Sequence, residues 1–197
     1  MKRRLLLAGV LALATSLLVA CGGGAQQWKT TNITGVMPDL KFTLTDENGK
    51  AVHADAYRGK VKVMYFGYTH CPDICPLTLS TVGRAVSQLG DQADGVRVLF
   101  VSVDPKRDPP KVLKEYTQAF GPEFVGLTGT QDQLKALSKR YRVSYSYAEP
   151  DANGEYAVNH SSAVFVFDKN GDVRLLMNRS DGVDAMAHDL AQLINAS

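Results

Sequence analysis

The chain has 197 residues, of which 45% are hydrophobic and 21% are charged, and its formal net charge is +2. This length predicts one domain with short accessory segments, and the apolar content is enough for a hydrophobic core. Because the first residues supply three of the positive charges, the remaining chain is close to neutral. The charge balance therefore gives no indication of nucleic-acid binding.

Residues 1–20 have the pattern of a secretory signal peptide. Three basic residues precede Leu5–Ala20, an apolar stretch of 16 residues, which is shorter than the ~20 residues of a membrane span. The stretch ends in LVAC, which resembles a bacterial lipobox, so cleavage is expected to leave Cys21 as a lipidated N-terminus. An uncleaved anchor helix is the alternative. Either form places the domain on the extracytoplasmic, periplasmic face of a membrane.

The lipidated cysteine and a flexible tether are expected to occupy residues 21–32, and the folded domain residues 33–197. Without the signal peptide the chain carries 19 basic and 20 acidic side chains, which is a formal charge of −1.

Strand and helix signals then alternate along the domain. Alternating residues from Phe42 to Thr45, followed by a turn sequence, predict an N-terminal hairpin. Val61–Phe66 is apolar enough for a central strand. After Cys71 and Cys75, Pro76 is expected to open a helix that ends at Gly90. Val96–Val103 is a second buried strand.

The second half of the chain continues this alternation. Asp108 is expected to cap a helix, residues 124–127 form a short strand, and Thr130 begins a capping box that opens the next helix. Residues 143–159 are polar and are expected to form a loop or an inserted hairpin. Two strands at residues 163–167 and 173–177 form a terminal hairpin, followed by an amphipathic helix.

This order predicts an α/β fold with a mixed central sheet flanked by helices, which resembles the thioredoxin fold. Ligands of open α/β sheets gather beyond the carboxyl ends of the strands, where Cys71 and Cys75 fall.

Cys71 and Cys75 are the only thiols left once Cys21 is lipidated. Four residues apart in a helical turn, they share one face with a rise of about 6 Å, so their sulfurs can bond each other or bind one metal ion. A nearby helix N-terminus is expected to lower the thiol pKa. In an oxidising compartment the pair is expected to form a disulfide unless another role uses it. A disulfide, a redox cycle and a metal site all remain open at this spacing.

His160 lies in the loop that leads into the terminal hairpin. In thioredoxin-like folds this loop faces the cysteines and usually carries a cis-proline, but this chain has no proline after Pro150. Two thiolates and one imidazole suit Cu(I), and they hold Cu(II) with an added weak ligand. The same set with a water molecule could bind zinc, which the spacing does not exclude.

Other residues near the motif or of metal-binding type have different expected roles. Asp104 follows the second buried strand and is expected near the site, either as a turn residue or as a group that supports the ligands or contacts a partner. The neighbouring charged residues are expected to be solvated: Lys106, Arg107 and Asp108. His70 is predicted to be a loop residue outside the metal site. Three methionines are expected to serve in packing: Met64, Met177 and Met186.

Four segments together resemble the signature blocks of the Sco/SenC family of copper-delivery proteins: YFGYTHCPDICP, VSVDPKRDPPKVLKEYTQAFG, GLTGT and VNHSSAVFVFD. The resemblance runs from about Ile33 to the C-terminus. It implies a thioredoxin-like fold, an anchor in the membrane and a role in building the copper A centre of cytochrome c oxidase subunit II. By the same match, Cys71, Cys75 and His160 would bind one copper ion per domain, as Cu(I) or Cu(II).

The predicted function is therefore that of a copper metallochaperone, which is not an enzyme in the turnover sense. Its partners would be subunit II or a similar copper protein, and a copper donor protein. The alternative is a thiol-disulfide reductase in which a redox-active Cys71–Cys75 pair keeps the recipient's cysteines reduced. Both can hold together, because a recipient must present reduced thiols before it accepts copper.

Overall fold

The structure is a computed structural model that describes residues 27–196. The predicted signal peptide, Cys21 and the first part of the tether lie outside these residues. An eight-stranded sheet has the order β1-β10-β9-β4-β5-β6-β2-β3, and β7 and β8 form a separate two-stranded sheet. The strands are β1 (Thr31–Asn32), β2 (Thr43–Asp46), β3 (Ala51–His53), β4 (Val61–Gly67), β5 (Val96–Ser102), β6 (Phe124–Thr128), β7 (Tyr145–Tyr147), β8 (Val158–His160), β9 (Val164–Phe167) and β10 (Val173–Met177).

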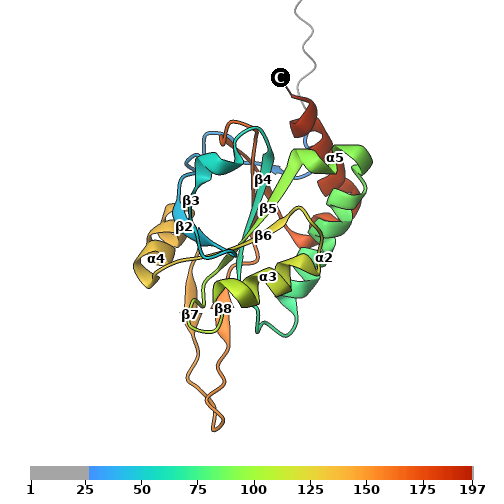
Figure 1. The fold of residues 1–197 in the computed structure, drawn as a ribbon. Helices are drawn as coiled ribbons and strands as arrows, with labels where there is room; N and C mark the ends of the chain where they lie inside the picture. The colour runs from blue at the N-terminus through green and yellow to red at the C-terminus, as the bar shows by residue number, and fades with distance from the viewer. Residues whose placement is uncertain (1–26, 197) are drawn as a thin grey trace, which may run out of the picture.

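Four α-helices accompany the sheet in this part of the chain: α2 (Ile74–Ser87), α3 (Pro110–Gln118), α4 (Gln131–Arg140) and α5 (Val183–Asn195). Short 3-10 turns are η1 (Ala54–Tyr57), η2 (Gly90–Gly95) and η3 (Arg179–Asp181). In Figure 1, α2, α3 and α5 lie along one side of the sheet and α4 lies on the other. The predicted α/β fold, with a mixed sheet between helices, is confirmed.

The centre of the sheet is formed by β4 and β5, whose sequences are mainly apolar. β4 pairs in parallel with β5, from Val61 opposite Val96 to Gly67 opposite Ser102. β5 continues in parallel to β6, whereas β9 pairs with β4 in the antiparallel direction. Every residue of β4 is buried. Both central strands therefore end at the same edge of the sheet, and the chain leaves β4 there to enter the cysteine motif.

The predicted N-terminal hairpin, the predicted terminal hairpin of β9 and β10, and the predicted capping box are all present. β2 and β3 pair antiparallel, and the Asp46 carboxylate accepts hydrogen bonds from the backbone N–H groups of Asn48 and Lys50 in their turn. The insertion at residues 143–159 forms most of a hairpin through β7 and β8, which projects from the body of the molecule (Figure 1). Thr130 Oγ1 accepts from the Gln133 N–H, and the Gln133 side chain accepts from the Thr130 N–H, which closes the capping box.

Two predicted helix starts differ in detail. The helix predicted to open at Pro76 begins at Ile74, so that Cys75 lies inside its first turn. Asp108 does not cap α3, since Pro109 occupies the cap position without a side-chain hydrogen bond. The Asp108 carboxylate instead turns into the protein, where it binds the cysteine loop.

The first described residues are fastened to the last helix. The Asp189 carboxylate of α5 is buried and accepts hydrogen bonds from the backbone N–H groups of Lys29 and Thr30, at 2.8–3.0 Å. Further along α5, the Gln192 side chain donates to the carbonyl oxygen of Gln27. The chain therefore enters the domain beside the C-terminal part of α5.

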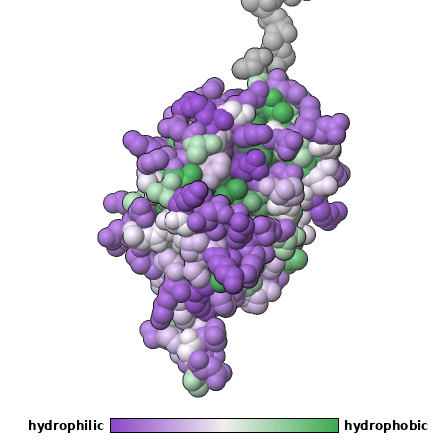
Figure 2. Space-filling view, viewed as in Figure 1, coloured by the Kyte–Doolittle hydropathy of each residue, from purple (hydrophilic) through white to green (hydrophobic). Residues whose placement is uncertain are grey.

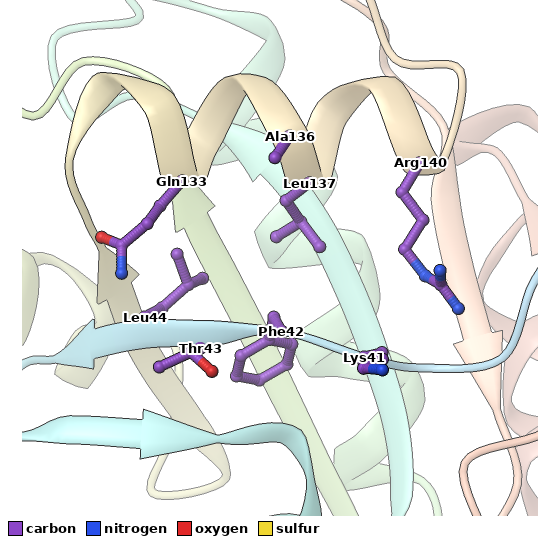
Figure 3. A pocket seen from close by; sticks show the side chains of 8 residues that line it. All are labelled: Lys41, Phe42, Thr43, Leu44, Gln133, Ala136, Leu137 and Arg140. Atoms are coloured by element: carbon purple, nitrogen blue, oxygen red, sulfur yellow. The ribbon is translucent and has the colours of Figure 1, made fainter.

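The surface is mainly polar. Figure 2 shows hydrophilic side chains over most of one face and over the projecting hairpin, with hydrophobic ones in small separate areas. A groove between α4 and β2 has Leu44 and Leu137 on its walls and Lys41 and Arg140 at one end (Figure 3). Its lining includes neither cysteine nor histidine. Among residues 27–196, none of the helices combines the length and apolar character needed to cross a membrane.

Candidate metal centre

Three predicted ligands meet beyond the carboxyl end of β4. One sulfur from each of Cys71 and Cys75 and one ring nitrogen of His160 all lie within 4.8 Å of one another. The contact between Cys75 Sγ and His160 Nε2 is 3.2 Å, although the two residues are 85 positions apart in sequence. Both cysteines are free thiols in this structure. The loop that carries His160 therefore faces the cysteine motif as predicted.

The end of β4 and the start of α2 position the two cysteines. Cys75 is completely buried in the first turn of the helix. A Cβ atom on Gly67 would lie 2.9 Å from Cys75 Sγ and 2.7 Å from a ring carbon of Phe100, distances that a side chain cannot occupy without displacing its neighbours. Cys71 precedes the helix and is half-buried, and its sulfur accepts a hydrogen bond from the Cys75 N–H at 3.4 Å. The pair thus consists of one accessible and one enclosed thiol.

The orientation of His160 leaves the correct nitrogen free to bind a metal. Its Nδ1 lies 2.9 Å from the carbonyl oxygen of Ser161. Because a carbonyl can only accept, Nδ1 carries the proton and Nε2 keeps its lone pair toward Cys75. Tyr65 and Tyr68 hold the imidazole by edge-on contacts, each with ring centroids 5.9 Å apart. A backbone acceptor that fixes the tautomer in this way is typical of metal-binding histidines.

The pKa of the Cys75 thiol is raised, whereas the sequence predicted a lowered one. A lowered thiol pKa was expected from the helix N-terminus, but burial raises the pKa of Cys75 to about 12. Desolvation wins here because the thiol is fully enclosed, so the neutral form is favoured without a metal. Burial also lowers the pKa of His160 below its usual value, which keeps the imidazole neutral at physiological pH. A bound cation would replace the proton of the thiol, since metal binding requires the thiolate.

The loop between β5 and α3 contacts both the cysteine loop and the hairpin that carries His160. Two of its charged residues were predicted to be solvated, and this prediction is wrong. Arg107 and Asp108 were expected to be solvated, yet Asp108 is fully buried and the Arg107 side chain is only 14% exposed. Asp108 accepts hydrogen bonds from the Thr69 N–H, the Thr69 hydroxyl and the Ser102 hydroxyl, at 2.6–3.0 Å. These bonds fix the loop that leads to Cys71. Lys106 is exposed, as predicted.

Asp104 is buried near the centre but does not contact its ligands directly. Its two carboxylate oxygens accept from Arg107 Nε at 2.6 Å and from the Tyr156 hydroxyl at 2.9 Å. Arg107 in turn lies 5.6 Å from the ring of Tyr68, which contacts His160. The carboxylate therefore reaches the imidazole through two intervening side chains.

The remaining candidates lie outside the cluster. The ring of His70 is near Thr69 and Asp108, at 3.1 and 3.7 Å, and its side chain is 46% exposed. The three methionines are buried in the core, as predicted. The roles of Tyr65, Tyr68 and Tyr156 were missed. Tyr68 adjoins the motif in sequence, whereas Tyr156 lies in the inserted hairpin and no sequence signal connects it to the site.

Chemically, the centre offers two soft sulfur donors and one imidazole nitrogen. A metal–sulfur bond is about 2.3 Å long, so two sulfurs within 4.8 Å of each other are close enough to bind one ion with small adjustments. Such a set fits Cu(I) in two- or three-coordinate geometry, and fits Cu(II) through the nitrogen donor. The donor set and its spacing therefore fit copper.

Sequence comparisons with known proteins point to one family. A sequence profile of the SCO1/SenC family matches residues 35–195. The chain is 40% identical over 131 residues to the SCO2-like protein RP587 of Rickettsia prowazekii, covering 66% of this chain and 64% of that protein. It is 44% identical over 133 residues to the mitochondrial protein SCO2 of Saccharomyces cerevisiae, covering 66% and 44%. The matches thus span less than two thirds of either relative.

A solved structure shows the same fold. The structure of Bradyrhizobium japonicum ScoI with copper bound superimposes with a TM-score of 0.72 at 35% identity, covering 79% of this chain and 98% of that chain. The thioredoxin-like architecture is therefore shared with a protein whose structure contains copper.

Proposed function

The chain belongs to the SCO1/SenC family, and on this premise we propose that it is a copper metallochaperone. Cys71, Cys75 and His160 bind one Cu(I) or Cu(II) ion, which the protein delivers to the copper A site of cytochrome c oxidase subunit II or a similar copper protein. The observation that carries the proposal is the convergence of the three ligand atoms within 4.8 Å. The copper-bound ScoI structure supports it from a relative with the same fold.

The two thiols differ in exposure, and this difference suits a protein that must release its copper ion to a recipient. Cys75 is enclosed between Gly67 and Tyr65, whose hydroxyl lies 3.7 Å from the sulfur. Cys71 is half-buried at the rim. An incoming thiolate from a recipient can therefore replace Cys71 first, while Cys75 and His160 still hold the ion. Stepwise exchange avoids the cost of releasing a free ion into water.

The proposal includes the location of the protein. We infer that lipidation at Cys21 anchors the domain on the periplasmic face of a membrane, where it receives copper from a donor protein. The LVAC sequence and the apolar stretch before it support this placement.

Thiol-disulfide reduction is the second candidate, and the same thiol asymmetry favours it. The accessible Cys71 thiolate would attack a disulfide in the recipient, and Cys75 would then resolve the mixed disulfide. Two electrons pass to the recipient, whose disulfide becomes two thiols while Cys71 and Cys75 become a disulfide. The high pKa of Cys75 slows the resolving step, which argues for metal binding as the main role.

The deciding experiment is a copper titration of the reduced full chain carrying Cys21→Ser, which leaves Cys71 and Cys75 as the only thiols. We expect one copper ion per chain, with a sulfur-to-copper charge-transfer band for Cu(II). A parallel insulin-reduction assay should show slow turnover compared with a thioredoxin. Fast general turnover together with no copper binding would favour the reductase instead.

A further inference from the structure

The hairpin formed by β7 and β8 determines where His160 lies. These strands pair only with each other, with Tyr145 opposite His160 and Tyr147 opposite Val158. The hairpin projects from the body (Figure 1), so beyond its covalent junction with β9 its position depends on side-chain contacts rather than on the ladder of the main sheet. Any residue that fixes the hairpin to the body therefore also fixes the imidazole.

Arg107 makes several of these contacts, and the Tyr147 hydroxyl makes two others, with the Val103 carbonyl oxygen and the Gln131 side chain. The Arg107 guanidinium donates to the Tyr156 carbonyl oxygen at 2.8 Å and to Glu155 Oε2 at 3.2 Å, and it lies 3.6 Å from the centroid of the Tyr156 ring. On the body side, its Nε donates to Asp104 at 2.6 Å. The Tyr156 hydroxyl donates to the other oxygen of Asp104. Asp104, Arg107 and Tyr156 therefore form a closed ring of contacts, which we call the arginine clamp.

Arg107 also contacts Tyr68, one of the two tyrosines that pack against the imidazole. Arg107 lies 5.6 Å from the ring of Tyr68, and that ring meets His160 edge-on, with an interplanar angle of 89°. Tyr156 is four residues before His160, in the segment that leads into β8. A single guanidinium thus contacts both the segment that enters the ligand-bearing strand and the aromatic ring beside the imidazole.

We propose that Arg107 is a positioning residue of the metal centre, which holds His160 Nε2 within reach of the two thiols without itself binding the ion. This inference rests on the proposed copper-binding function. Its consequence is selective: weakening the clamp lets the hairpin and its imidazole move away, while the cysteine pair stays in place. Cu(II), which needs the nitrogen donor, should then suffer more than Cu(I), which two thiolates can hold.

The neighbouring Asp108 provides a contrast. It binds Thr69 and Ser102 and has no contact with the hairpin among its hydrogen bonds. The same short loop therefore contains one residue for the thiol half of the centre and another for the imidazole half. Variants at these two positions should fail in different ways.

The test compares Arg107→Lys and Arg107→Met with the wild type, using the reduced full chain with Cys21→Ser. Lysine keeps a positive charge beside the buried Asp104 but loses the stacked, multiply bonded fork. Arg97→Lys is the matched control, because Arg97 binds only the Pro122 carbonyl oxygen among its hydrogen bonds. Thermal unfolding of each variant establishes that it is folded before copper is added.

We expect Arg107→Lys to weaken Cu(II) binding about 10–100-fold, the usual effect of losing a group that orients a metal ligand, and to change Cu(I) binding much less. In a His160→Ala background the same substitution should cause no further loss, because Arg107 acts through His160. An unchanged Cu(II) affinity in Arg107→Lys, or an undiminished loss in the His160→Ala background, would overturn the proposal.

A measurement without metal separates this inference from the proposed function. In the metal-free protein, the rings of Tyr65 and Tyr68 should shift the NMR signals of the His160 ring, and Arg107→Lys should move these signals toward solvent-exposed values. If the wild type binds no copper but the shifts change, the proposed function fails and the positioning role stands. If copper binds and neither the shifts nor the Cu(II) affinity change, only the positioning role fails.

Discussion

Replacing His160 by alanine tests the metal centre most directly. The substitution removes one of three ligand atoms that lie within 4.8 Å of each other and leaves the two thiols intact. The alternative imidazole beside Cys71 in the sequence is that of His70, which is turned toward Asp108 and is 46% exposed. No other described side chain of a metal-binding type joins the cluster, so the lost nitrogen has no ready replacement.

The expected loss can be estimated from the donor set. Removing even a group that only supports a metal ligand costs about 10–100-fold in affinity, and removing the ligand itself should cost at least as much for Cu(II). That range corresponds to about 1.4–2.8 kcal/mol of binding free energy. Cu(I) should lose less, because both sulfurs can still bind one ion in linear geometry.

The assay follows the sulfur-to-copper charge-transfer band during Cu(II) titration, with a thiol count after each addition. In His160→Ala the band should collapse while the count stays at two. His53→Ala is the control, since His53 is exposed on β3 and bonds to Thr43. If His160→Ala binds Cu(II) with the spectrum and affinity of the wild type, His160 is not a ligand and the reasoning fails.

Three further predictions concern the supports of the site and the anchor. Gly67→Ala should destabilise the fold by about 1–3 kcal/mol through overpacking and weaken copper binding, because the new Cβ would meet Cys75 Sγ at 2.9 Å; denaturant unfolding and copper titration measure both, and a variant like the wild type would contradict the packing argument. Asp189→Asn should cost about 1–3 kcal/mol at neutral pH: burial alone would raise the pKa of Asp189, but hydrogen bonds from Lys29, His188 and Thr30 lower it below 3.8. The stabilisation is therefore fully present above pH 3.8 and is lost as the pH falls through the folded-state pKa, so denaturation curves of the variant and the wild type should converge in acid; a gap that stays constant down to pH 2 would contradict this. Cys21→Ser should abolish lipidation and leave an uncleaved precursor in mass spectra, whereas an unmodified mature chain that begins at another residue would argue against the lipobox.

The sequence predicts the framework well because the framework depends on local patterns. The mainly apolar sequences of β4 and β5 indicate central strands, and turn residues mark the hairpins. Lys62 shows where such patterns mislead. It is 1% exposed in the middle of the sheet, where its ammonium group donates to the carbonyl oxygens of Asp168 and Lys169. Burial lowers its pKa to about 8. A charged residue in a buried strand is satisfied here by a turn that is distant in sequence.

The proximity of Cys71, Cys75 and His160 was predictable because topology brings the carboxyl end of a central strand and the loop before the terminal hairpin together. The residues that support these three side chains were not predictable in the same way. Arg107 and Tyr156 are 49 positions apart, and their contact depends on how an inserted hairpin folds back. Asp108 has the sequence features of a helix cap, but its carboxylate is more strongly satisfied by three donors from Thr69 and Ser102. Local preference therefore gives way to tertiary hydrogen bonding at this loop.

If Cys21 is lipidated as proposed, the attachment of the N-terminal segment to α5 limits the distance between the candidate metal centre and the membrane. Gln27 is held by Gln192, and the next turn of α5 packs through Ile194 against Gly95, just before β5 begins. The metal centre lies at the other end of the central strands, and in Figure 1 the C-terminal end of α5 and the projecting hairpin lie at opposite ends of the molecule. β5 has seven residues, which span about 23 Å at ~3.3 Å each. The six residue-to-residue steps from Cys21 to Gln27 can span at most about 22 Å. An anchored domain would thus hold its candidate metal centre on the side away from the membrane, no more than a few tens of ångströms from the membrane surface. A recipient would have to present its own copper site within that distance of the membrane, with the site facing the membrane.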